Sequence, residues 1–436
     1  MLQEKPIKKK IAFHTLGCKL NFAETSTIAR SFPPEMFERV PANAKADIYI
    51  INTCSVTDTA DKKCRQAINK FIHQSPDAFI AVVGCYAQLN PGKISSIPGV
   101  DLVLGTNEKF DIGKYLLNLR KKDTAEVHSC DLSPDDIFFK SSSIGDRTRS
   151  FLKIQDGCDY CCSYCTIPKA RGKSRNPTIE SILEEAVKIA ESGIKEIVLT
   201  GVNIGDFGKS TGDSFEELLK RLIKIKGILR YRISSIEPNL LTDNIIRLAK
   251  DSGIILPHFH IPLQSGSDKI LGLMRRRYRT KTFEERVNRI KDIMPLAGIG
   301  ADVIVGFPGE TCDDFEDTYS FLSSLPVTYL HVFSFSERPG TPAADMSGKV
   351  TSKDKEERSK VLINLSETKH NDFCIKNEGA RSEVLFEHAR SDGKISGFTG
   401  NYLKVEHPWD SNLAGKVIPV KMISTLPDGR MSVEIL

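Results

Sequence analysis

The chain has 436 residues, which is enough for about three domains of ordinary size. Its 40% hydrophobic and 27% charged residues are typical of globular proteins, and 30 glycines with 21 prolines exclude a collagen-like chain. The formal net charge of +5 is compatible with a polyanionic partner but is too small to identify one. No apolar run reaches the ~18 residues of a membrane span, and no apolar signal segment follows the basic start, so we expect a cytoplasmic protein that binds no membrane.

Residues 1–120 alternate short apolar runs with helical stretches. Four runs predict strands, at 11–15, 46–52, 78–83 and 101–104. Apolar positions at helical spacing predict a helix over 58–73. Strands that alternate with helices form a parallel sheet. We therefore predict an N-terminal parallel-sheet α/β domain over 1–120, followed by a linker over 121–147 that lacks clear periodicity.

A second series of six strand-like runs follows the linker, beginning at residues 150, 196, 231, 258, 301 and 329. Six βα units predict a partial (β/α)6 barrel, because a complete barrel needs eight. The Lys/Glu-rich segment 352–376 predicts a connecting helix, so the central domain spans 148–376. The last domain, 377–436, alternates short strands with turns and predicts a small all-β barrel of OB-like size.

Four of the eleven cysteines lie within eight residues, in the segment GCDYCCSYCTIP at 157–168. An odd number of cysteines in a cytoplasmic chain argues against a disulfide framework. Structural zinc sites usually pair cysteine motifs a dozen or more residues apart, whereas three thiolates on one tight loop fit one face of a [4Fe–4S] cluster. Two triplets satisfy this loop, one through Cys161 and one through Cys162, each with Cys158 and Cys165. Either triplet leaves one iron open to a ligand.

A second set of cysteines, Cys18, Cys54 and Cys85, follows three successive strands of the N-terminal domain. The carboxyl ends of parallel strands line the crevice in which open α/β sheets bind ligands. A lone cysteine is more often a small buried apolar residue. The same placement repeated three times instead predicts a second cluster on three thiolates. The remaining cysteines are predicted not to be ligands: Cys64, Cys130, Cys312 and Cys374.

The loop at 157–168 resembles the radical S-adenosylmethionine signature, with Cys158, Cys162 and Cys165 at its spacing and Tyr164 before the last cysteine. The resemblance implies that these three bind the cluster and that Cys161 is a spare thiol. Over essentially the whole chain, a series of phrases occurs in the order found in the methylthiotransferase family: TLGCKLN, INTCSVT, GCYAQ, QDGCDYCCSYCTIPKARG, LTGVNIG, HIPLQSGSD, DVIVGFPGET and FSERPGTPA.

Membership of this family implies a radical S-adenosylmethionine barrel followed by a TRAM domain that engages RNA. It implies two [4Fe–4S] clusters and two molecules of S-adenosylmethionine per turnover, one that methylates a sulfur and one that yields a radical. The segments GCKLN and NTCSVTDTADKK are most similar to the branch that methylthiolates carbon 2 of N6-threonylcarbamoyladenosine beside the tRNA anticodon. The implied partners are tRNA and a reducing protein such as flavodoxin or ferredoxin, and the implied state is a monomer.

Three alternatives remain open at this stage. Two are other methylthiotransferase branches, which act on isopentenyladenosine in tRNA or on an aspartate of a ribosomal protein. The third belongs to another class, an RNA-binding protein whose clusters are structural or redox-sensing. Reductive cleavage of S-adenosylmethionine separates the classes, because a purely structural cluster has no open iron.

Other residues near the predicted strand ends have assigned roles. Contacts to S-adenosylmethionine are predicted for Tyr164, Gly201, Asn203, Ser235, Glu237, Gln264 and Gly306. Contacts to RNA phosphates are predicted for two basic runs, Lys169, Arg171, Lys173, Arg175, Arg275, Arg276 and Arg277. Core or rim positions, without a ligand role, are predicted for His14, His258, His260 and His331. No catalytic residue is predicted beyond the cluster ligands. Residues 377–436 hold seven Lys/Arg against eight Asp/Glu, so this domain would bind RNA by a local patch or by shape.

Overall fold

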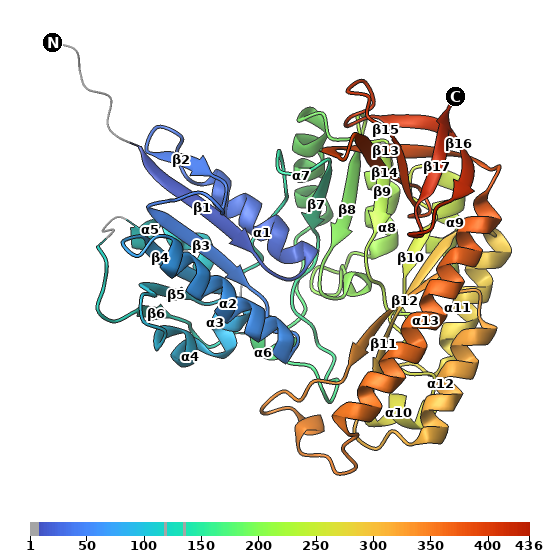
Figure 1. The fold of residues 1–436 in the computed structure, drawn as a ribbon, viewed down its shortest axis with the longest axis horizontal. Helices are drawn as coiled ribbons and strands as arrows, with labels where there is room; N and C mark the ends of the chain where they lie inside the picture. The colour runs from blue at the N-terminus through green and yellow to red at the C-terminus, as the bar shows by residue number, and fades with distance from the viewer. Residues whose placement is uncertain (1–7, 117–119, 134–136) are drawn as a thin grey trace. The chain divides into compact units, whose positions relative to one another are not determined.

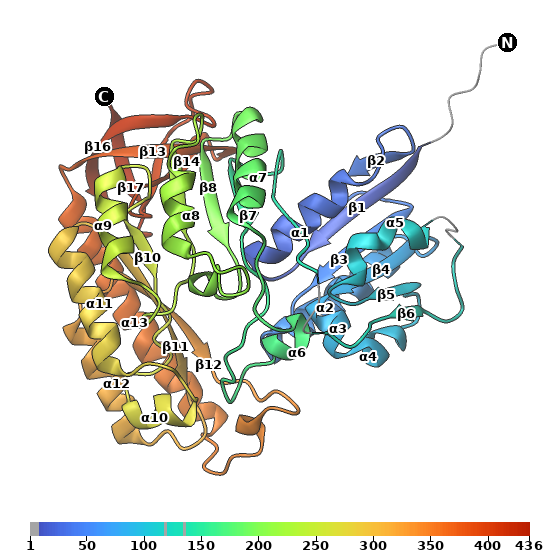
Figure 2. The ribbon, with the colours of Figure 1, turned by 180° about the vertical axis from the view of Figure 1, so that it is seen from behind.

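The structure is a computed structural model that describes residues 8–116, 120–133 and 137–436. These residues form two compact units, shown in Figures 1 and 2. The first unit contains the chain up to Ser143 together with Asp156–Tyr160 and Cys165–Arg175. The second contains Ile144–Gln155, Cys161–Tyr164 and the remainder from Asn176. None of the helices in the described ranges is both long and apolar enough to cross a membrane.

The first unit is built on a six-stranded parallel sheet in the order β2-β1-β3-β4-β5-β6 (Figure 1). Its strands are β1 (Lys9–Thr15), β2 (Phe37–Val40), β3 (Ile48–Thr53), β4 (Phe79–Gly84), β5 (Leu102–Leu104) and β6 (Glu126–His128). Its helices are α1 (Lys19–Arg30), α2 (Asp58–Gln74), α3 (Cys85–Leu89), α4 (Pro91–Ser95), η1 (Glu108–Asp111), α5 (Ile112–Tyr115) and α6 (Ile167–Arg171). The central strands β3 and β4 are buried at every position because helices cover both faces of a parallel sheet.

The parallel α/β sheet is confirmed, but it is two strands wider than the sequence predicts. Strand β2 is polar and largely exposed at one edge of the sheet. Strand β6 lies at the other edge, inside the segment predicted to be a linker, where Glu126 pairs with Leu102. Edge strands tolerate charged residues, so hydrophobic periodicity does not reveal them. The domain boundaries themselves stay a prediction.

The central part of the second unit contains six parallel strands in two sheets, β7-β8-β9 and β10-β11-β12. The strands are β7 (Arg149–Lys153), β8 (Glu196–Thr200), β9 (Arg230–Ile233), β10 (His258–His260), β11 (Gly298–Val305) and β12 (Tyr329–Ser334). A parallel bridge between Ser235 and His260 joins the two sheets and gives the predicted partial barrel. Five helices pack on its outer face: α7 (Ile179–Glu191), α8 (Phe215–Leu222), α9 (Asp243–Ser252), α11 (Thr280–Ile293) and α12 (Cys312–Ser324). The short helix α10 (Asp268–Leu273) belongs to a separate small core with Phe307 and Phe335.

The C-terminal strands form a closed barrel in the order β13-β14-β15-β17-β16, which confirms the predicted small all-β domain. They are β13 (Arg381–Ser391), β14 (Lys394–Thr399), β15 (Lys404–Pro408), β16 (Val417–Thr425) and β17 (Met431–Ile435). The connecting helix α13 (Ser352–Asn377) precedes them, capped at its start by the Thr351 side chain. Leu362 of α13 is buried in the core of the central barrel.

The C-terminal barrel closes the amino end of the central barrel. Arg232 of β9 donates hydrogen bonds to the carbonyls of Thr399 and Gly400, at 3.2 and 3.0 Å. The same guanidinium lies over the Tyr402 ring, 4.7 Å from its centroid. Burial raises the pKa of Glu196, but Arg232, Arg230 and Arg149 together outweigh burial and hold the pKa below its ordinary value. Because the amino end of the central barrel is closed by these contacts, a ligand must enter the barrel interior from another side.

A substitution at Gly300 of β11 tests how tightly the barrel interior is packed. A Cβ at this position would lie 2.2 Å from ring atoms of Tyr329, so we expect Gly300→Ala to destabilise the second unit by about 1 to 3 kcal/mol. Gly272→Ala is the matched control, since its nearest neighbour would be Arg279 at 3.5 Å. Chemical unfolding of both variants measures the difference, and equal stability of the two would contradict this packing.

Candidate functional site

Cys158 and Cys165 belong to the first unit, and backbone amides point at both thiols. Tyr160 donates its N–H to Cys158 Sγ at 3.4 Å, and Ile167 donates its N–H to Cys165 Sγ at 3.4 Å. Hydrogen bonds of this kind stabilise sulfur ligands and tune the potentials of iron–sulfur clusters. The donor set and its surroundings therefore fit the cluster predicted for this loop.

Cys162 of the second unit is buried, whereas Cys161 is exposed. Arg276 donates from Nη1 to Cys162 Sγ at 3.2 Å and forms an ion pair with Glu237. Burial raises the pKa of Cys162, and the positive charge of Arg276 opposes that shift. Burial also raises the pKa of Glu237, against the same arginine. These contacts favour the triplet that excludes Cys161, and this assignment stays a prediction.

Gln155, two residues after the end of β7, accepts hydrogen bonds from the turn that contains Gly201 and Asn203. Its Oε1 accepts the N–H groups of Val202 and Asn203 at 2.9 and 2.8 Å. A Cβ on Gly201 would lie 2.9 Å from that oxygen, so the close approach requires glycine. The sequence analysis missed Gln155, although a polar residue at the carboxyl end of a barrel strand is a usable signal.

The other residues predicted to contact S-adenosylmethionine are also held by neighbours. The Tyr164 ring packs edge-on against Phe307, and the Gly306 N–H donates a hydrogen bond to Glu310. Isolated β-bridges join Ser235 to His260 and Gln264 to Val303. Gln264 has a φ of 71° and Gly306 a φ of 73°. Glycine adopts this region freely, but glutamine is strained there, and such strain collects at functional sites. Contact of these residues with S-adenosylmethionine stays a prediction.

Cys18, Cys54 and Cys85 lie at the carboxyl ends of β1, β3 and β4 in the first unit. Burial raises the pKa of Cys54 to about 12, and the neighbouring thiols of Cys18 and Cys85 add to the shift. Gly17 lets the first loop reach this position, because a Cβ there would lie 2.8 Å from Cys54 Sγ. Three adjacent thiols at one sheet edge fit an iron–sulfur cluster with three protein ligands.

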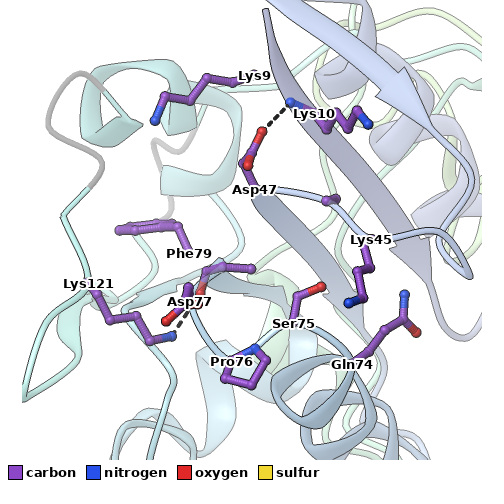
Figure 3. A pocket seen from close by; sticks show the side chains of 12 residues that line it. Lys9, Lys10, Lys45, Asp47, Gln74, Ser75, Pro76, Asp77, Phe79 and Lys121 are labelled. Carbon is purple, nitrogen blue, oxygen red and sulfur yellow. Dashed lines mark hydrogen bonds between the residues drawn. The ribbon is translucent and has the colours of Figure 1, made fainter.

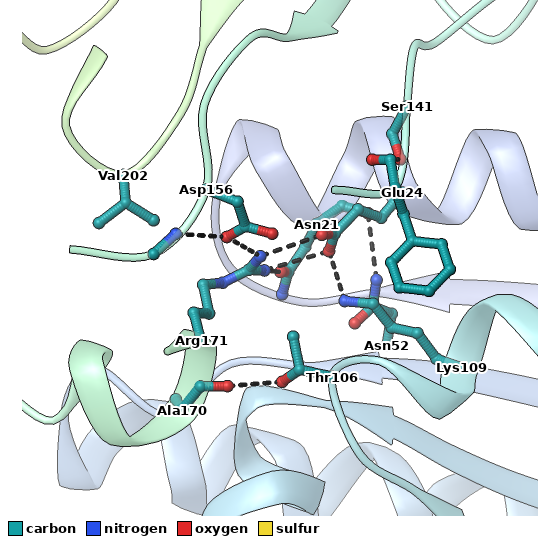
Figure 4. A network of polar contacts seen from close by, with 12 residues as sticks. Asn21, Glu24, Asn52, Thr106, Lys109, Ser141, Asp156, Ala170, Arg171 and Val202 are labelled. Carbon is teal, nitrogen blue, oxygen red and sulfur yellow. Dashed lines mark hydrogen bonds and ion pairs between the residues drawn. The ribbon is translucent and has the colours of Figure 1, made fainter. Parts of the chain in front are cut away.

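Arg171 is buried in the first unit and bonded on three sides (Figure 4). Its Nη1 lies 3.0 Å from a carboxylate oxygen of Glu24 and 3.0 Å from one of Asp156. Its Nη2 donates to Asn21 Oδ1 at 2.7 Å. Lys109 bonds the other oxygen of Glu24 at 2.6 Å, and both of these side chains are 0% exposed. We call these five residues the Arg171 network.

The Arg171 network connects the two cysteine segments within the first unit. Asn21 and Glu24 lie on α1, which begins directly after Cys18, while Asp156 and Arg171 stand before and after the cysteine loop. Burial raises the pKa of the Cys85 thiol, and the positive charges of Arg171 and Lys109 oppose it. The network therefore places two cations beside the second set of cysteines.

Three of the arginines predicted to contact RNA are buried against other residues of the protein. Arg171 is 1% exposed and serves the network, and Arg175 is buried with Nη1 bonded to the Arg171 carbonyl at 2.6 Å. The side chain of Arg276 is 5% exposed and contacts Cys162. Runs of basic residues indicate phosphate contact only when their side chains reach solvent. The exposed members of the two runs are Lys169, Lys173, Arg275 and Arg277.

The sequence analysis also missed Asn21, Glu24, Lys109 and Asp156. Their signal is polarity at buried helical positions, since Asn21 and Glu24 lie three residues apart between Leu20, Ala23 and Ile28. A polar pair within an apolar helix face needs buried partners. The partners are distant in the chain, so the sequence alone does not identify them.

A separate cavity of about 430 Å³ lies at the amino ends of β1, β3 and β4 (Figure 3). Lysines line it together with Asp47 and Asp77. Lys121 donates to Asp101 at 2.9 Å, and the Lys10 N–H donates to Asp47 at 2.7 Å. None of the candidate cluster ligands lines this cavity, and Cys18, Cys54 and Cys85 lie at the opposite, carboxyl ends of these strands.

Two family models match the chain. Residues 152–322 match the Radical SAM superfamily, and residues 10–105 match Uncharacterized protein family UPF0004. Among solved structures, the radical S-adenosylmethionine methyltransferase TsrM from Kitasatospora setae is similar in fold, with a TM-score of 0.55 at 13% identity over 78% of this chain and 77% of that one.

Curated relatives match nearly the full length. The chain is 40% identical to the threonylcarbamoyladenosine tRNA methylthiotransferase MtaB of Bacillus subtilis, over 95% of this chain and 93% of the relative. It is 36% identical to the protein of the same name from Thermotoga maritima, over 97% and 96%. It is 32% identical to the tRNA-2-methylthio-N(6)-dimethylallyladenosine synthase of Aquifex aeolicus, over 97% of each. The chain therefore belongs to the methylthiotransferase family of the radical S-adenosylmethionine superfamily.

Substitution of Arg171 distinguishes a structural role from an RNA role. Arg171→Met removes the cation that the buried carboxylates of Glu24 and Asp156 share and leaves them only Lys109 and Arg175, so we expect a loss of about 3 to 5 kcal/mol in the unfolding free energy of the first unit. Lys169→Met, on the same helix but exposed, is the control and should change stability by no more than about 0.5 kcal/mol. Denaturant unfolding followed by circular dichroism measures both. A stable Arg171→Met protein that only binds RNA more weakly would contradict the network.

Proposed function

We propose that this protein transfers a methylthio group to carbon 2 of N6-threonylcarbamoyladenosine in tRNA, next to the anticodon. The observation that carries the proposal is the presence of two separate sets of three cysteines at strand ends, in a chain that is 35–40% identical to relatives named for this activity. Relatives named for the dimethylallyl substrate are 32–33% identical. The identities thus favour the threonylcarbamoyl substrate.

Each cysteine set has its own proposed cluster. Cys158, Cys162 and Cys165 would hold the cluster implied by the superfamily, and Cys18, Cys54 and Cys85 would hold a second one. When bound, the first cluster supplies the electron that cleaves S-adenosylmethionine, and the second presents the sulfur that is methylated and transferred, with two molecules of S-adenosylmethionine used per turnover.

The residues around Cys162 and the neighbouring strand ends would bind and orient the substrate. Arg276 donates a hydrogen bond to Cys162 and pairs with Glu237, whose carboxylate would accept hydrogen bonds from the hydroxyl groups of a bound nucleoside. Gln155 fixes the turn that contains Gly201 and Asn203, so that a ligand could approach the backbone of this turn closely. The closed amino end of the barrel excludes water from that side.

The proposed partners follow from the reaction. The tRNA would contact exposed basic residues, for which Lys169, Lys173, Arg275 and Arg277 are the candidates. The cleavage step needs a low-potential electron donor such as flavodoxin or ferredoxin. We propose a monomer that acts in the cytoplasm, where its tRNA substrate is found.

Triple substitutions separate the two clusters. Anaerobically reconstituted protein should bind about eight irons, and alanine at Cys18, Cys54 and Cys85 together should leave about four. This variant should still form 5′-deoxyadenosine but no methylthio nucleoside, while alanine at Cys158, Cys162 and Cys165 should abolish 5′-deoxyadenosine. Iron analysis and mass spectrometry of nucleosides give both readouts. Methylthiolated tRNA from either triple variant would refute the two-cluster proposal.

Single substitutions identify the third ligand of the cysteine loop. Cys161→Ala should retain cleavage of S-adenosylmethionine, because the thiol is exposed and outside the proposed triplet. Cys162→Ala should abolish cleavage and lower the bound iron by about four. The two variants differ by one position on the same loop and control for each other. The reverse pattern would assign the ligand to Cys161.

A further inference from the structure

Strand β12 has one face in the core and one open face. Leu330 and Val332 pack against the main hydrophobic core of the second unit. Because side chains alternate along a strand, Tyr329, His331 and Phe333 share the opposite face, which is the inner face of the barrel. The side chain of His331 is 53% exposed, and Phe333 is 44% exposed. An imidazole and a phenyl ring, two residues apart, are therefore accessible on this inner face.

Asp302 of β11 holds His331 in place. The two residues are partners in the strand register, and Oδ1 of Asp302 lies 3.3 Å from Nδ1 of His331 and 2.9 Å from Nε2 of His260. Burial raises the pKa of Asp302, but the hydrogen bonds from the two imidazoles outweigh it and hold the pKa well below its usual range. The carboxylate is therefore ionised, and it fixes His331 with Nδ1–H toward it and Nε2 facing away.

The layer beneath these residues is filled by rings. His258 Nε2 lies 2.9 Å from the Tyr329 hydroxyl, and the Tyr402 ring lies 4.5 Å from the His258 ring. Tyr329 also covers Gly300, as the blocked Cβ position there shows. His260, Asp302 and His331 thus form the floor of the open part of the barrel. A ligand that enters from the carboxyl ends of the strands meets Phe333 and then His331.

The chemistry of this floor suits an aromatic base that carries an acidic arm. An exposed phenyl ring is a stacking surface for a nucleobase. A protonated imidazole that is held by the partly buried Asp302 carboxylate donates a charge-assisted hydrogen bond to a second carboxylate. The threonylcarbamoyl arm ends in a carboxylate, whereas the dimethylallyl arm is uncharged and has no hydrogen-bonding group. A site that hydrogen-bonds a substrate group rejects the analogue that lacks it.

We propose that Phe333 and His331 form the subsite for the N6 arm of the substrate, with His331 as the residue that selects the carboxylate; this rests on the proposed function. Phe333 stacks against the adenine, and Nε2–H of His331 donates to the carboxylate of the arm. Asp302 and His260 are positioning residues that act through His331. His331 then lies between two carboxylates, that of Asp302 on its Nδ1 side and that of the arm on its Nε2 side.

Binding of modified anticodon stem-loops tests the subsite. The probes are one RNA with N6-threonylcarbamoyladenosine and the same RNA with the arm carboxylate converted to its methyl ester. Fluorescence anisotropy should show that the reconstituted protein binds the acid at least about ten-fold more tightly than the ester. His331→Gln and His331→Phe should bind the acid as weakly as the ester. Bound iron and thermal unfolding establish that each variant is folded, and His73→Gln, at an exposed position of α2, should bind like the unmodified protein.

The outcomes separate the subsite from the proposed function. Equal loss of acid and ester binding in both His331 variants would overturn the subsite, as would an unmodified protein that does not distinguish the two RNAs. Discrimination without methylthiolation would support the subsite and reject the proposed function. Methylthiolation without discrimination would support the function and overturn the subsite.

Discussion

The buried charge of Arg171 is the constraint on which the first unit depends. One guanidinium satisfies Glu24, Asp156 and Asn21 at once, and Lys109 completes the pairing of Glu24. A buried ion of either sign is unstable alone, so each partner requires the others. Because α1 begins after Cys18 and Arg171 follows Cys165, this requirement holds segments of both cysteine sets in one folded unit. The structure thereby joins two motifs that are 140 residues apart in the chain.

A second group of buried charges joins distant segments within the second unit. Glu196 and the two arginines of β9 close the barrel interior on strands of the C-terminal barrel. Asp302 and His331 of the same barrel are partly exposed, and we propose that His331 binds the substrate while Asp302 positions it.

The sequence predicts the architecture well where apolar periodicity is strong and poorly at the sheet edges, where β2 and β6 are short and polar. It also predicts which cysteines stand at strand ends, because strand order and cysteine position are both local information. The sequence does not predict that Arg171, Arg175 and Arg276 are buried. Charge is visible in a sequence, but whether a guanidinium faces solvent or a carboxylate 147 residues away depends on tertiary packing. Asp302 was missed for the same reason, since its imidazole partners lie on two other strands.

A competition assay tests the central claim most directly. Reconstituted protein, reductant and S-adenosylmethionine are incubated with an equal mixture of two anticodon stem-loops, one carrying N6-threonylcarbamoyladenosine and the other N6-dimethylallyladenosine. Mass spectrometry of the digested RNA should show a methylthio group on the threonylcarbamoyl nucleoside, with little on the dimethylallyl nucleoside. Methylthiolation of the dimethylallyl RNA alone, or 5′-deoxyadenosine formed without modification of either RNA, would contradict the account.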